Sequence, residues 1–157
     1  MPLPQLDDVP IRYNHVCYVT DDFDGSMATF AAMGVTGERV EASVVTFALC
    51  DVAPVVLDRF AAGDEGALST VPTRIELLMP TSGGTIFSEH LDRHGPGLHH
   101  IGIAVADFDR YFDALVACGC EATLDLRGVF GDDSPMQVCF FDCSAVGFPA
   151  IEMFGRH

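Results

Sequence analysis

The sequence contains no lysine, and its eight arginines are outnumbered by 23 aspartates and glutamates, so its formal net charge is −15. A surface that binds nucleic acid or an anionic membrane needs clustered cations, and the arginines form no cluster along the chain. We therefore expect neither nucleic acid nor a membrane among its partners. The same shortage of cations disfavours a substrate that carries several phosphates.

The sequence contains no long apolar run, and we expect no export signal from its first residues. No stretch reaches the roughly 18 apolar residues that can span a bilayer. The first residues, MPLPQLDDVP, contain prolines and acids where a secretory signal has a basic end and an apolar segment. With 157 residues, of which 49% are hydrophobic, the composition fits one globular domain, 1–157, in the cytoplasm.

The six cysteines show no spacing that is typical of a zinc site. Cys118 and Cys120 form a C-x-C pair, and Cys139 and Cys143 lie four positions apart. Most of the cysteines lie among Val, Phe and Ala. We therefore expect small, buried, reduced thiols and no disulfide framework.

The sequence repeats itself with an offset of 85 residues. Segment 14–34, NHVCYVTDDFDGSMATFAAMG, aligns without a gap with segment 99–119, HHIGIAVADFDRYFDALVACG. The alignment places His15 on His100 and Gly34 on Gly119, with the same strand, helix and stop signals between them. This pattern indicates one structural unit that is duplicated in the chain.

Each copy predicts the element order βαβββ, which makes the fold class α+β. The first strands are expected at 12–19 and 98–105, each followed by a helix that an aspartate caps: Asp21 or Asp22 in one copy, and Asp107 in the other. The remaining strands are expected at 37–42, 43–50 and 73–79, and at 121–127, 136–143 and 148–154. Module one then spans about 11–80 with an insertion at 51–72, a linker helix spans about 85–94, and module two spans about 98–154.

Alternation along the first strand of each copy separates the histidines from the apolar face. Val16 and Tyr18 are expected to pack under the helix, so His15 points to the other side of the sheet. Ile101 and Ile103 are expected to pack under the second helix in the same way, so His100 also points to the other side of the sheet. His99 is then expected to face away from this site.

The last strand of each copy contains a single acid between apolar residues. Glu76 lies between Ile75 and Leu77, and Glu152 has a matching position in the second copy. Burying such a carboxylate is costly unless a cation compensates its charge. Glu76 alone could pair with Arg74, but the repeat symmetry favours one divalent ion shared by four ligands. These ligands are His15, Glu76, His100 and Glu152, and they suit Co, Ni, Mn, Zn or Fe(II).

The segment PTSGGTIFSEHLDRHGPGLHHIGIAV resembles the linker helix and second-module start of methylmalonyl-CoA epimerases, in the vicinal oxygen chelate (glyoxalase/bleomycin resistance/dioxygenase) superfamily. The resemblance implies two tandem βαβββ modules that form an open, barrel-like mixed sheet around a metal site, in a homodimer. It also implies the same four ligands. Two positions depart from the epimerases: Glu76 replaces their usual Gln, and Thr46 stands where bacterial epimerases have a catalytic Glu.

The leading hypothesis is a divalent-metal-dependent isomerase or lyase that moves a proton next to a carbonyl through a metal-bound enolate. Glu152 or Glu76 would be the catalytic base, as the resemblance to glyoxalases implies, and the substrate would carry vicinal oxygens or an acyl thioester. One alternative is an Fe(II)-dependent extradiol-type dioxygenase that uses His15, His100 and Glu152 as a facial triad. Another is a non-catalytic protein that binds a small molecule such as a drug.

Overall fold

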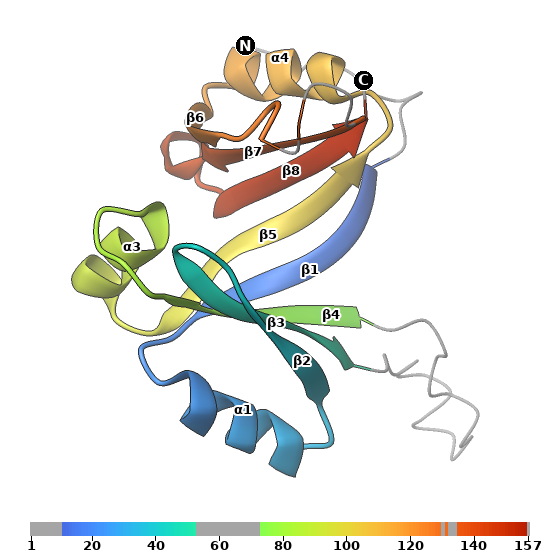
Figure 1. Ribbon diagram of the computed structural model, residues 1–157. Helices are drawn as coiled ribbons and strands as arrows, with labels where there is room; N and C mark the ends of the chain where they lie inside the picture. The colour runs from blue at the N-terminus through green and yellow to red at the C-terminus, as the bar shows by residue number, and fades with distance from the viewer. Residues whose placement is uncertain (1–10, 53–72, 130, 132–134, 157) are drawn as a thin grey trace, which may run out of the picture. The chain divides into compact units, whose positions relative to one another are not determined.

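The computed structural model describes residues 11–52, 73–129, 131 and 135–156 (Figure 1). Within them the chain forms β1 (Ile11–Val19), α1 (Phe23–Ala32), β2 (Thr36–Glu41), β3 (Val45–Val52), β4 (Thr73–Pro80), α3 (Ile86–His94), β5 (Gly97–Val105), α4 (Phe108–Cys118), β6 (Glu121–Asp125), β7 (Met136–Asp142), the 3₁₀ turn η2 (Ser144–Val146) and β8 (Ala150–Arg156). The strands are hydrogen-bonded in the order β2-β3-β4-β1-β5-β8-β7-β6. β5 and β8 pair parallel, whereas β7 and β8 pair antiparallel, so the mixed α+β class is confirmed.

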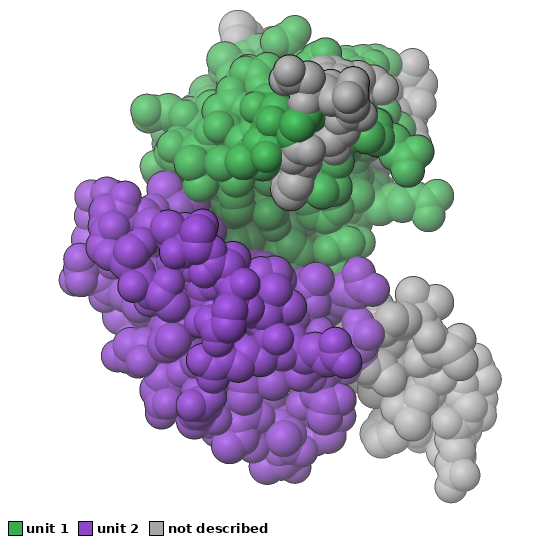
Figure 2. Space-filling model, viewed as in Figure 1, with its two compact units in different colours: residues 1–16, 99–157 green, residues 17–98 purple. Residues whose placement is uncertain are grey.

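The chain divides into two compact units (Figure 2). One unit contains the described residues up to Val16 together with those from His99 onward, and the other runs from Cys17 to Leu98. β1 and β5 therefore each contribute residues to both units.

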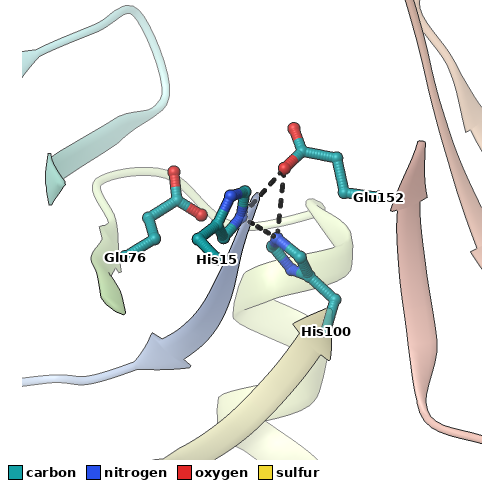
Figure 3. Close-up of side chains that lie close together, drawn as sticks. All are labelled: His15, Glu76, His100 and Glu152. Carbon is teal, nitrogen blue, oxygen red and sulfur yellow. Dashed lines mark hydrogen bonds and ion pairs between the residues drawn. The ribbon is translucent and has the colours of Figure 1, made fainter. Parts of the chain in front are cut away.

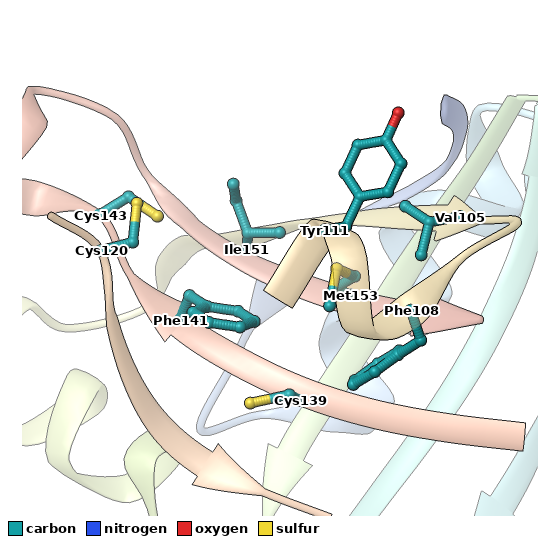
Figure 4. Close-up of a cluster of buried hydrophobic side chains, with 9 residues drawn as sticks. All are labelled: Val105, Phe108, Tyr111, Cys120, Cys139, Phe141, Cys143, Ile151 and Met153. Atoms are coloured by element: carbon teal, nitrogen blue, oxygen red, sulfur yellow. The ribbon is translucent and has the colours of Figure 1, made fainter. Parts of the chain in front are cut away.

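In the unit that contains the second half of the chain, α4 packs on one face of the strands. The Asp107 side chain accepts a hydrogen bond from the Arg110 backbone N–H at 3.1 Å, and Gly119 ends the helix in the left-handed region at φ 98°. The core beneath α4 is shown in Figure 4 and consists of Val105, Phe108, Tyr111, Cys120, Cys139, Phe141, Cys143, Ile151 and Met153. β7 is buried from Gln137 to Phe141, so both of its faces are covered.

In the other unit, β2, β3 and β4 form an antiparallel meander, against which α1 packs. Asp22 caps α1 with a 3.0 Å bond from the Gly25 backbone N–H, and its φ and ψ of −129° and 85° nearly repeat the −130° and 93° of Asp107. Of the two predicted caps, Asp22 is therefore the residue used, and the two copies begin their helices alike. Thr85 caps α3 in a reciprocal capping box with Ser88.

The predicted insertion at 51–72 needs one correction. Asp51 and Val52 belong to β3, where they pair with Arg74 and Thr73 of β4. Residues 53–72 lie outside the described part of the chain. Among the described residues, none of the helices has both the length and the apolar character needed to cross a bilayer.

Candidate metal centre

His15 and His100 bring their imidazole nitrogens together from neighbouring strands of one unit. His15 lies on β1 and His100 on β5, and their exposed fractions are only 3% and 1%. The two Nε2 atoms lie 3.1 Å apart. Phe154 stacks on the His15 ring and Phe140 meets the His100 ring edge to face, so apolar side chains support both imidazoles.

Glu152 completes a group of three ligand atoms, as Figure 3 shows. Its Oε2 lies 3.1 Å from Nε2 of His15 and 3.4 Å from Nε2 of His100. The carboxylate is 18% exposed, whereas the two imidazole side chains are 4% and 0% exposed. Glu152 is therefore the member of this group that water or a substrate reaches most easily.

The separations between these three atoms fit a divalent ion. Two atoms that bind one ion at about 2.1 Å lie about 3.0 Å apart at right angles and about 3.4 Å apart at tetrahedral angles. The distances of 3.1, 3.1 and 3.4 Å fall in that range. Two imidazoles and a carboxylate suit Zn, Co, Ni, Mn or Fe(II).

Each imidazole is also held through its other nitrogen by the residue that precedes it. The His15 Nδ1 lies 2.9 Å from the Asn14 Oδ1, and the His100 Nδ1 lies 2.9 Å from the His99 Nδ1. A hydrogen bond at Nδ1 fixes the ring and leaves Nε2 as the ligand atom. His99 was expected to face away from the ligand group, and its ring contacts His100 at Nδ1, not at the grouped Nε2. Asn14 was not predicted, although the repeat aligns it with His99.

Gly102 makes room for the His15 ring. A Cβ added at this position of β5 would overlap the imidazole and fall 2.7 Å from Nε2. Gly102 lies two positions after His100 on β5, so strand alternation puts both residues on one face, which agrees with this contact. Position 102 therefore requires glycine, because the His15 side chain of the neighbouring strand β1 approaches it closely.

Glu76, also labelled in Figure 3, lies on β4 and is half-buried. It belongs to the unit from Cys17 to Leu98, whereas the other three predicted ligands belong to the second unit. Its role as a fourth ligand stays a prediction. The neighbouring Arg74 donates from Nε to Asp51 Oδ1 at 3.1 Å.

Thr46 is buried and donates a hydrogen bond of 2.5 Å to Glu41 Oε2. This bond, followed by the one from Arg39, holds the pKa of the Glu41 carboxyl below its usual range. Glu41 pairs with Thr46 in the register of β2 and β3, so it is the carboxylate opposite this position. A carboxylate that is stabilised as an anion in this way is a weak base.

The family model described as the Glyoxalase/Bleomycin resistance protein/Dioxygenase superfamily matches residues 14–140, and the chain belongs to this superfamily. This confirms the resemblance noted in the sequence. No curated protein sequence matches the chain significantly.

Solved structures share the fold. A methylmalonyl-CoA epimerase of Streptomyces coelicolor, in complex with 2-nitronate-propionyl-CoA, is 18% identical, with 92% of this chain and 96% of that chain covered and a TM-score of 0.66. The epimerase of Mycobacterium tuberculosis is also 18% identical, with 92% and 87% covered and a TM-score of 0.64. A hypothetical protein of Bacillus halodurans is 16% identical, with 94% and 95% covered and a TM-score of 0.66. At these identities the likeness shows the fold alone.

Proposed function

We propose that the protein is a divalent-metal-dependent isomerase or lyase that transfers a proton next to a substrate carbonyl. The observation that carries this proposal is the group of His15, His100 and Glu152, whose ligand atoms lie within 3.4 Å of one another. We propose Glu76 as the fourth ligand. The ion would act as a Lewis acid that stabilises negative charge on the substrate oxygens.

In this proposal the two histidines stay fixed while a carboxylate moves the proton. Both imidazoles are almost fully buried and are held at Nδ1 by Asn14 and His99, so they hold their positions. Glu152 is the most exposed of the three grouped ligands and can exchange a proton with a substrate. Glu76 is the second candidate base.

The substrate class in this proposal is a molecule with vicinal oxygens or an acyl thioester. Epimerases of the same fold have been solved with 2-nitronate-propionyl-CoA and with methylmalonyl-CoA, which supports an acyl thioester. We propose a homodimer in the cytoplasm as the working state of the enzyme.

A dioxygenase is the second candidate, because two histidines and one carboxylate within one unit also form the facial set that non-haem Fe(II) oxygenases use. The two candidates differ in their need for oxygen. A fourth protein ligand at Glu76 would occupy a position that oxygen and a bidentate substrate require, so it favours proton transfer.

The test is solvent deuterium exchange under anaerobic conditions. Protein loaded with Zn or Co is incubated in D₂O with methylmalonyl-CoA and with a panel of 2-oxo and 2-hydroxy acids, and loss of the α-proton is followed by NMR. We expect exchange for one member of the panel, at least about 100-fold slower in Glu152→Gln and close to normal in Thr46→Ala. Turnover only with Fe(II), coupled to oxygen uptake and insensitive to Glu76→Ala, would instead identify a dioxygenase.

A further inference from the structure

A cavity with a volume of about 810 Å³ lies in the same unit as the three grouped ligands. The cavity lies next to these ligands along β8. Alternate residues of a strand share a face, so Glu152, Phe154 and Arg156 lie on the same side of the sheet. Phe154 links the two places, because its ring stacks on His15, 6.4 Å between centroids, and also lines the cavity.

The walls of the cavity are apolar and come from the strands on either side of β8. In the register of the sheet, Ala104 of β5 pairs with Phe154, and Met136 of β7 pairs with Arg156. The side chains of Ala104 and Ala106 are small, which leaves room beside them for a bound molecule. Ala104, Ala106, Met136 and Phe154 can contact a hydrocarbon segment, and none of these four side chains is a strong hydrogen-bonding group.

Two arginines, Arg12 and Arg156, line the same cavity. Neither forms an ion pair with any residue that the structure describes, although the whole chain has 23 acidic residues for its eight arginines. Four other arginines do form ion pairs with acids: Arg39, Arg74, Arg93 and Arg127. Because no acid in the described part of the chain pairs with Arg12 or Arg156, both cations beside this apolar cavity can pair with an anion from outside.

We propose that this cavity binds the far end of the substrate, with Arg12 and Arg156 holding a carboxylate or phosphate and Phe154 and Met136 contacting an apolar spacer. This inference rests on the proposed function only in placing the reactive end of the substrate at the metal centre. Glu152 and Arg156 lie four positions apart, which is about 13 Å along a strand. The site therefore selects an elongated anionic substrate over a three-carbon acid.

The test measures binding, so it does not depend on turnover. Octanoate, octyl phosphate and the neutral octanamide are titrated calorimetrically into Zn-loaded protein, and the titrations are repeated with Arg12→Gln, Arg156→Gln and Arg156→Lys. Arg93→Gln is the matched control, since this exposed arginine on α3 pairs with Glu89 and lies outside the cavity.

We expect at least one anion to bind more tightly than octanamide, and each Gln variant to weaken that anion about 10- to 100-fold. Arg156→Lys should restore part of the affinity, and Arg93→Gln should change nothing. The tighter of the two anions identifies the substrate group as carboxylate or phosphate. Equal binding of octanamide and both anions, or anion binding that both Gln substitutions leave intact, would overturn the proposal. If an anion binds in an arginine-dependent way but no substrate exchanges deuterium, the proposed anion site stands and only the proposed reaction is rejected.

Discussion

At the residue scale, the candidate metal centre depends on pairs of adjacent residues in which one is a ligand and the other orients it. Asn14 precedes His15 and His99 precedes His100, and each pair is joined at Nδ1 by a 2.9 Å contact. The two orienting residues differ chemically, because an asparagine oxygen only accepts whereas an imidazole nitrogen donates or accepts. The Asn14 bond therefore specifies the tautomer of His15 with protonated Nδ1 and a free lone pair on Nε2.

Removing that acceptor should weaken metal binding. We expect Asn14→Ala to lower the affinity for Zn or Co about 10- to 100-fold, since outer-shell partners of metal-binding histidines have effects of that size. Asn14→Asp keeps an oxygen acceptor and should bind the ion nearly as well as the natural protein. Competition with a chromophoric chelator measures both affinities. An unchanged affinity in Asn14→Ala would show that the neighbouring packing alone orients His15.

The sequence allowed the grouping of three side chains to be predicted, while their role as metal ligands stays a prediction. His15, His100 and Glu152 follow from the repeat and from strand alternation, which are visible without coordinates. Arg12 and Arg156 lie at opposite ends of the chain, and only strand pairing brings them to one cavity. The orientation of His99 depends on side-chain torsions that strand periodicity does not determine.

At the element scale, most predicted bounds agree with the structure to within two residues, and local chemistry explains the shifts. β8 begins at Ala150, two positions later than predicted, after the 3₁₀ turn and Pro149, whose nitrogen has no hydrogen to donate to a ladder. β6 ends early at Asp125, because its carboxylate accepts the Arg127 backbone N–H at 3.0 Å and turns the chain.

The two glycines of β5 provide a matched test of how this strand forms the site. Gly102→Ala should displace the His15 ring and reduce metal affinity at least about tenfold, because the new Cβ would overlap the imidazole. At Gly97 an added Cβ meets nothing within 4 Å, so Gly97→Ala on the same strand should bind metal normally. Metal titration and thermal unfolding of both variants separate the two effects. Equal affinities in the two variants would mean that β5 can shift to accommodate a methyl group.

At the scale of the whole molecule, both units bury their cysteines in apolar cores. Cys17 and Cys50 lie in one unit and Cys120, Cys139 and Cys143 in the other, and all five are buried. All six cysteines of the chain are free, which agrees with the prediction of reduced thiols without a disulfide framework. Cys118 alone is partly exposed, near the end of α4.

Thiol reactivity should therefore report the integrity of both units at once. Burial, followed by the nearby Asp125, raises the pKa of Cys139 to about 11, and burial, followed by the Cys120 thiol, raises the pKa of Cys143 to about 12. A thiol with a pKa near 11 is only about 0.1% ionised at pH 8, and the thiolate is the form that iodoacetamide attacks. We expect one fast-reacting thiol per folded chain at pH 8, which Cys118→Ser removes, and six after unfolding in guanidinium. If Cys118→Ser still shows a fast-reacting thiol, at least one of the two cores opens rapidly, and the exposed residue found by peptide mapping would identify the unit concerned.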